Sequence, residues 1–204
     1  VIGYMPQKFG LYENLSVTEN LQLYAALHAV PPEQQRQRFS ALLEMTDLAR
    51  FPDRPAGKLS GGMKQKLALA CSLVSEPALL LLDEPTVGVD VLSRRELWQI
   101  LRQIAVARNT TILVSTSYMD EADYCDRVLV LFQGKLIADG PPEAIRNKAA
   151  EMVPHPTFEQ GFQMLISGSV PPPLIRTTPP EAQAGIMIHA RDLVKKFGTF
   201  AAVD

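Results

Sequence analysis

The segment Ala78–Asp90, ALLLLDEPTVGVD, is the most informative stretch of this 204-residue sequence. Its four consecutive leucines form a short, wholly apolar run, which is typical of a strand buried on both faces of a parallel sheet. The run ends at two adjacent carboxylates, Asp83 and Glu84, and Pro85 follows them. Because α/β folds bind ligands at the carboxyl edge of such strands, we expect both acids to serve a site there.

Strand patterns alternate with helical patterns after this segment. Apolar residues recur at helical spacing over 97–104, and TTILVST (110–116) is a second apolar run of strand length. The segment 127–140 holds two β-rich runs joined at Gln133-Gly134, which predicts a hairpin. This alternation indicates an α/β fold with a parallel sheet.

A compact block of three helices is expected before the acidic strand, at about residues 13–76. Ser16 and Glu19 form a capping-box pattern, and two prolines open the second helix. The side chains expected to face the core from the first helix are Leu21, Tyr24, Leu27 and His28. Those expected from the third helix are Met63, Leu67, Ala70, Cys71 and Val74.

Composition excludes several classes of protein. The formal net charge is −2, so the chain lacks the basic field of a nucleic-acid binder. No apolar run reaches the ~18 residues that a membrane-spanning helix needs. The two cysteines, Cys71 and Cys125, are far apart in apolar surroundings, which favours small unpaired core residues over a disulfide.

A second motif, LSGGMKQ (59–65), opens the third helix. Ser60 can cap this helix, while Gly61 and Gly62 leave its first amides uncovered. A helix N-terminus with free N–H groups and a positive dipole end suits a phosphate. The plainer interpretation is a helix cap followed by flexible glycines. The acidic strand one helix downstream favours the phosphate site.

Together LSGGMKQ, LLLLDEP and GVD resemble the ATP-binding cassette (ABC) family, the ATPase subunits of ABC transporters. The resemblance covers about Val1 to Lys148. It implies an α/β fold with a partial P-loop NTPase (RecA-like) parallel sheet core and an inserted α-helical signature subdomain. It also implies ATP and Mg²⁺ as cofactors.

The resemblance implies a role for each matching residue. Asp83 matches the magnesium-binding aspartate, and Glu84 matches the catalytic base. Gln7, in YMPQ, matches the glutamine that contacts the metal and links the site to the membrane subunit. Asp90, in VGVD, matches the loop that crosses the dimer interface; the less favoured alternative is a plain N-cap for the following helix. The nucleotide-binding signature loop corresponds to Ser60, Gly61 and Gly62.

The sequence departs from the family pattern at two points. No G-x-x-x-x-G-K-[ST] phosphate loop occurs in the 204 residues. We therefore expect the chain to be a fragment whose phosphate loop lies upstream of Val1, and to bind ATP poorly alone. Second, Ser117 stands where the family usually has a histidine that orients Glu84 and the water. Serine cannot carry the imidazolium charge, so we expect slowed catalysis at this site.

The last third of the sequence suggests a boundary and a second domain. We predict a partial ABC ATPase domain at 1–148 and a proline-rich linker at 149–184. Residues 185–204 resemble the start of a second ABC ATPase domain. Phe197 then matches the aromatic residue on which adenine stacks, although a core aromatic is an equal alternative.

The predicted function is that of an energy-coupling ATPase of a membrane exporter, similar to ABC-2 type drug or antibiotic efflux systems. Its expected partners are a second ABC ATPase domain and a membrane-spanning permease, with no nucleic acid. The expected location is peripheral, on the cytoplasmic face of the cell membrane. One alternative is a soluble tandem ABC ATPase acting on ribosomes or nucleic acid. Another is a catalytically impaired regulatory cassette.

Overall fold

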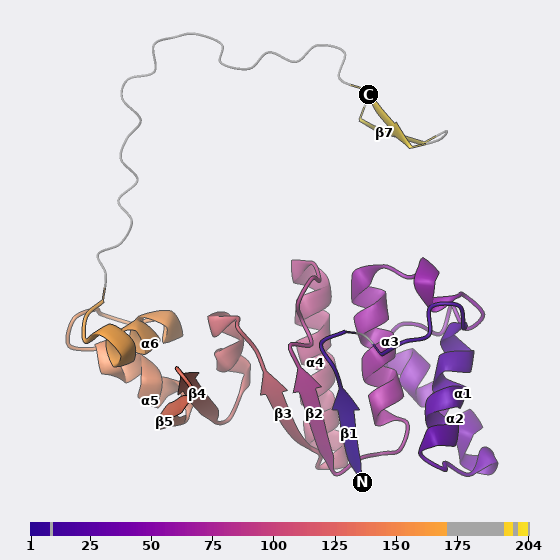
Figure 1. The fold of residues 1–204 in the computed structure, drawn as a ribbon, viewed down its shortest axis with the longest axis horizontal. Coiled ribbons are helices and arrows are strands. Elements are labelled where there is room, and N and C mark those ends of the chain that lie inside the picture. Colours follow the sequence, from indigo (N-terminus) through magenta and orange to yellow (C-terminus); the bar gives the residue numbers. More distant parts are fainter. Residues whose placement is uncertain (9, 171–193, 198–199, 204) are drawn as a thin grey trace. The chain divides into compact units, whose positions relative to one another are not determined.

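The computed structural model describes residues 1–8, 10–170, 194–197 and 200–203 (Figure 1). Residues Val1–Ser169 form one compact unit and Val170–Asp204 a second. The strands are β1 (Ile2–Met5), β2 (Leu79–Asp83), β3 (Thr111–Ser115), β4 (Val128–Phe132), β5 (Lys135–Gly140), β6 (Lys195–Phe197) and β7 (Phe200–Val203). The α-helices are α1 (Val17–Leu27), α2 (Pro32–Met45), α3 (Gly61–Leu73), α4 (Val91–Arg108), α5 (Pro142–Arg146) and α6 (Phe158–Ser167). The 3₁₀ helices are η1 (Ala56–Lys58), η2 (Met119–Tyr124) and η3 (Asn147–Ala149).

The central feature of the first unit is a parallel sheet with the strand order β1-β2-β3. Met5 is paired with Leu82, and Asp83 is paired with Ser115. All three carboxyl ends therefore meet at one edge of the sheet. The predicted α/β fold with a parallel sheet is confirmed.

One face of this sheet carries the core. Gly3 lies so close to α3 that an added Cβ would come within 2.5 Å of the Ser72 carbonyl oxygen. Leu80 and Leu82 of β2 are buried on this face, against a core that α3 and α4 share. Figure 1 shows these two helices beside the strands, with α1 and α2 beyond α3.

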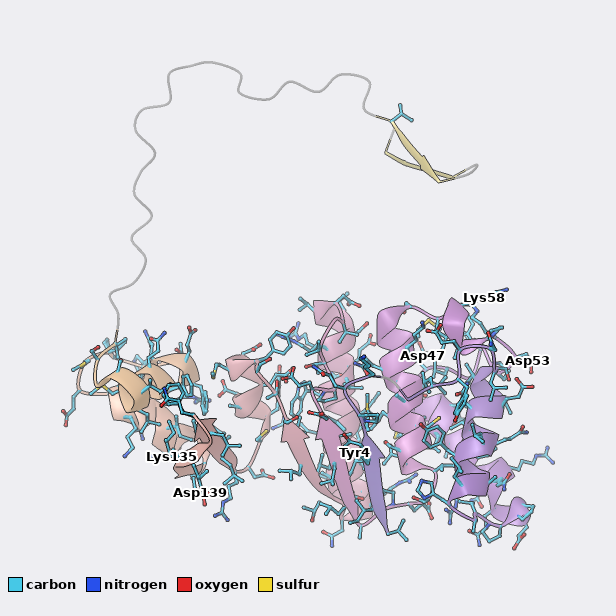
Figure 2. The ribbon with its side chains drawn as sticks, in the orientation of Figure 1. Tyr4, Asp47, Asp53, Lys58, Lys135 and Asp139 are labelled. Atoms are coloured by element: carbon cyan, nitrogen blue, oxygen red, sulfur yellow. The ribbon has the colours of Figure 1, made fainter. Side chains whose placement is uncertain are left out.

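The other face of the sheet is open in the described part of the chain. Ile2, Tyr4 and Leu113 are each more than half exposed, and Tyr4 is labelled on β1 in Figure 2. Leu79 and Leu81 of β2 are only half-buried. The expectation that β2 is buried on both faces is therefore wrong for this chain, because no described helix covers the second face.

The helical block forms as predicted, with two errors in and after α1. Ser16 caps α1, and Glu19 completes the capping box through both of its hydrogen bonds. Leu27, however, is exposed, since it lies about 240° around the helix from buried Leu21. His28 is also exposed because it is the C-cap, beyond the last turn. The buried residues of α1 are Val17, Asn20, Leu21 and Ala25.

The predicted hairpin is confirmed. Strands β4 and β5 pair antiparallel, and Figure 2 labels Lys135 and Asp139 on β5. Gln133 and Gly134 both have positive φ, 48° and 74°, as a type I′ turn requires.

The first unit ends at Ser169, inside the range 149–184 that was predicted to be a linker. Helix α6 lies inside the range 149–184, and its N-cap Thr157 forms a capping box with Gln160. Phe158 of α6 is buried in a cluster with Ile145 of α5, so this part of the predicted linker is packed. The rest of that range, 171–184, lies outside the described residues.

Two smaller expectations have a structural outcome. Both cysteines are free, and burial raises the pKa of the Cys71 thiol. Of the described helices, none combines the length and apolar character that crossing a membrane requires. In the second unit β6 and β7 form an antiparallel pair.

Candidate functional site

The candidate site begins where β2 and β3 end side by side. Asp83 and Ser115 are the last residues of these strands and are register partners. The Ser115 hydroxyl donates a hydrogen bond to Asp83 Oδ1 at 2.6 Å. By strand alternation both side chains belong to the open face of the sheet. The carboxylate of Asp83 is thus oriented by β3 and lies next to open space.

Glu84 turns the chain out of the strand. Its φ is +48°, a left-handed conformation that costs a non-glycine residue about 1–2 kcal/mol. The Glu84 N–H donates to the Ser115 carbonyl oxygen at 3.0 Å, which offsets part of this cost. The Glu84 side chain therefore leaves in a different direction from that of Asp83.

Ser117 lies next to this glutamate. Its hydroxyl donates to Glu84 Oε2 at 3.3 Å, across 33 positions of sequence. The structure thus brings Asp83, Glu84 and Ser117 together at one sheet edge, as the sequence predicted. Ser117 is exposed and Glu84 is half-buried, so water can reach the contact.

The residues at this edge fit a magnesium ion held jointly with phosphate. Magnesium is usually bound by one or two carboxylates, several waters and substrate phosphates. Asp83 supplies a carboxylate of this kind, and Glu84 lies directly after it. Among the described residues no group of three or more His, Cys, Asp or Glu could hold a metal, so an all-protein cage is not formed there.

Gln7 follows β1 at the same edge. It lies two residues beyond Met5, whose register partner Leu82 immediately precedes Asp83. The Gln7 side chain is exposed. Its predicted role as a metal contact stays a prediction, and strand pairing is what places it near the acids.

The signature segment forms a second cluster. Ser60 is the N-cap of α3 and accepts a hydrogen bond from the Met63 N–H at 3.3 Å. Gly61 is exposed, whereas Gly62 is buried against the start of α4. A Cβ at Gly62 would lie 2.3 Å from Ser93 Oγ, so only glycine lets the two helix starts approach this closely.

Asp90 belongs to this second cluster. Its Oδ1 accepts from the Leu92 and Ser93 N–H groups, each at 3.0 Å, and Oδ2 accepts from the Ser93 hydroxyl at 2.7 Å. These bonds, that of the Ser93 hydroxyl foremost, lower the pKa of the Asp90 carboxyl. The N-cap alternative is therefore the role seen in this chain, and the interface role stays a prediction.

Two residues of the first cluster were missed by sequence reasoning. Ser115, which orients Asp83, could have been found as the terminal residue of the second apolar strand. Glu121 of η2 carries no local signal, and it is fully buried with hydrogen bonds to Thr86 and Thr116.

Phe197 was predicted to stack on adenine. Its backbone lies in β6, and its side chain is outside the described part of the structure.

Comparison with known proteins gives a consistent set of relatives. Residues 1–87 match the family model described as ABC transporter. The chain is 58% identical over 150 residues to the probable multidrug ABC transporter ATP-binding protein YbhF of Escherichia coli (strain K12). It is 42% identical over 147 residues to the daunorubicin resistance ATP-binding protein DrrA2 of Streptomyces coeruleorubidus.

The chain covers only part of these relatives. The two alignments take in 74% and 72% of this chain, but 26% of YbhF and 45% of DrrA2. A solved structure, the dimeric post-hydrolysis state of the ATP-binding cassette MJ0796 bound to ADP and Pi, superposes with a TM-score of 0.61 at 28% identity. That match covers 69% of this chain and 62% of the other.

Proposed function

We propose that this chain, which carries an ATP-binding domain of the ABC transporter family, is part of a protein that hydrolyses ATP to drive a membrane exporter. The names of two relatives, a multidrug transporter component and a daunorubicin resistance protein, support an exporter of drug-like or antibiotic molecules. The formal net charge of −2 does not favour the alternative of a nucleic-acid partner.

The observation that carries the proposal is the contact between Ser117 Oγ and Glu84 Oε2 beside Asp83. Asp83 is the residue that would hold Mg²⁺, which neutralises charge on the phosphates when bound. Glu84 would accept the proton of the attacking water on its carboxylate. The Ser117 hydroxyl donates to that same carboxylate at 3.3 Å.

We propose two kinds of partner. The similar cassette MJ0796 is dimeric with ADP and Pi bound, which supports pairing of this domain with a second ABC ATPase domain. In that arrangement the cluster of Ser60, Gly61, Gly62 and Asp90 would face the partner's nucleotide. A membrane-spanning permease would be the second partner, with this domain peripheral on the cytoplasmic face. Residues 185–204 would begin a second ABC domain.

A second candidate function is a catalytically impaired regulatory cassette. The serine at position 117 favours it, because a neutral hydroxyl stabilises a carboxylate and a phosphate less than an imidazolium does. Both candidates share nucleotide binding and differ in turnover. Measured turnover therefore separates them.

The experiment is to replace Glu84 in the intact protein from which this chain comes. Glu84→Gln should lower Mg²⁺-dependent ATP hydrolysis by ~10²–10⁴-fold, since a general base contributes about that much. ATP binding should remain, because the amide keeps the size of the side chain. Glu44→Gln, at an exposed position of α2, is the matched control. Equal loss in both variants, or no loss in Glu84→Gln, would contradict the proposal.

A further inference from the structure

Glu121 is an ionisable residue with no exposed surface. Its Oε1 accepts a hydrogen bond from Thr86 Oγ1 at 2.7 Å, and its Oε2 accepts one from Thr116 Oγ1 at 2.6 Å. A buried carboxylate is costly unless its oxygens are paired in this way. Both threonines are therefore held firmly against one side chain.

The two threonines come from the two segments that build the candidate site. Thr86 lies two residues after Glu84, in the turn that follows β2. Thr116 lies between Ser115 and Ser117, directly after β3. Glu121 thus links the segment at the end of β2, which carries Asp83 and Glu84, to the segment after β3, which carries Ser117. Thr86 and Glu121 are 35 positions apart in the sequence.

We call Glu121 and its two hydrogen-bonded threonines, Thr86 and Thr116, the clamp. Residues of η2 and α4 make further contacts with it. Arg94 of α4 places Nε 3.8 Å from Glu121 Oε1 and donates to Asp120 Oδ2 at 2.7 Å. Its guanidinium also lies 4.6 Å from the centre of the Tyr118 ring. The Tyr118 N–H in turn donates to Thr116 Oγ1 at 3.1 Å. The clamp is therefore anchored to α4, the helix that Asp90 caps.

The contact at the site surface is weaker than the clamp beneath it. The Ser117–Glu84 hydrogen bond is long, at 3.3 Å, and lies where water competes for both groups. Both bonds are accepted by a carboxylate, but the Thr86–Glu121 bond is shorter, at 2.7 Å, and buried, which makes it the stronger of the two. The position of Ser117 relative to Glu84 is therefore set mainly by the hydrogen bonds to Glu121, of which that from Thr86 is buried and that from Thr116 is partly buried.

We propose that Glu121 is a positioning residue that holds Ser117 and Glu84 in their mutual orientation through Thr116 and Thr86. This rests on the proposed function, because the orientation matters for ATP hydrolysis. Glu121 itself touches neither the nucleotide nor the reacting water. Loosening it should slow the chemical step and leave nucleotide affinity unchanged.

The test is steady-state ATPase kinetics of the intact protein with Thr86→Val. Valine keeps the volume and removes the donor, so kcat should fall by ~10-fold or more, as displaced catalytic groups do, with KM for ATP within about twofold. Thr86→Ser restores the hydroxyl and should recover most of the kcat. The matched control is Thr46→Val, which removes a buried hydroxyl that donates to the Leu42 carbonyl at 2.7 Å in α2. It should lower the melting temperature without changing kcat.

Hydrogen exchange of the same proteins separates failure of this inference from failure of the proposed function. Thr86→Val should speed exchange in both 83–89 and 115–119, and Thr46→Val in neither. An inactive wild-type protein would defeat the proposed function, while the exchange pattern still decides whether the clamp exists. Three results would overturn the inference. They are faster exchange in only one of the two segments, an unchanged kcat in Thr86→Val, and a rise in KM that accounts for the whole loss of activity.

Discussion

Ser117 stands where the resemblance to the ABC family predicts a histidine. Its hydroxyl reaches Glu84 Oε2 at 3.3 Å, so the serine occupies a position from which a side chain can orient the proposed base. A serine supplies one neutral donor, whereas an imidazole at the same place can carry a positive charge. The hydrogen bond to the proposed base is therefore present at this edge, but its donor is neutral and binds a carboxylate more weakly than an imidazolium would.

Replacing this serine tests how much the difference costs. In the intact protein Ser117→His should raise kcat for ATP hydrolysis by about 10-fold. Hydrogen bonds to charged groups contribute about 1.5–3 kcal/mol, and 1.36 kcal/mol corresponds to a factor of ten in rate. Ser117→Ala serves as control and should show no gain. An unchanged rate in Ser117→His would show that the serine does not limit turnover.

At the scale of elements, the contact that sets the second cluster is between the starts of α3 and α4. The N-cap Ser60 opens one helix and the N-cap Asp90 opens the other. Gly62 lets them meet, because Ser93 occupies the space that a larger residue would need. The geometry of the predicted signature loop thus depends on how two helices pack, as well as on its own residues.

A pair of glycine substitutions tests this helix contact. Gly62→Ala should destabilise the protein by about 1–3 kcal/mol, the usual cost of overpacking, since the new Cβ would lie 2.6 Å from the Ser93 Cβ. Gly61→Ala is the control, because its Cβ would meet the Gly88 carbonyl oxygen at an ordinary 3.5 Å. Thermal melts of the two variants give the comparison. Equal melting temperatures would mean that α3 and α4 do not approach as described.

At the scale of the whole molecule, the first unit is larger than the sequence suggested. It continues through α6 to Ser169, and α6 packs on the backbone of α5. An added Cβ at Gly161 would come within 2.1 Å of the Ile145 carbonyl oxygen. Close backbone contact of this kind belongs to a folded domain, not to an extended connector.

Gly161→Ala distinguishes a packed α6 from a free one by the sign of its effect. Alanine would stabilise an isolated linker helix by about 1 kcal/mol relative to glycine. In the packed unit it should instead lower the melting temperature, because the Ile145 backbone cannot move aside. Urea or thermal denaturation of the variant and of Gly168→Ala, whose site is open but has φ +68°, gives the measurement and a strain control. A raised melting temperature for Gly161→Ala would restore the linker interpretation.

The features that could be read from the sequence are those that depend on near neighbours in the chain. The capping box of Ser16 and Glu19 and the Gln133-Gly134 turn are local conformations with few alternatives. The apolar run before Asp83 was enough to predict a strand that ends at two adjacent carboxylates. Leu27 shows the limit even here, since helical spacing alone did not show that it falls outside the buried face of α1.

The remaining features come from segments that meet only after folding. Ser115 orients Asp83 because β2 and β3 are in register, and Glu121 joins Thr86 to Thr116 because η2 packs beneath both strand ends. No local pattern encodes such pairings, since hydrogen bonds between distant segments depend on strand order and on which layer covers which face. The acids of the site were therefore predictable, while the residues that hold them in place required the packed molecule.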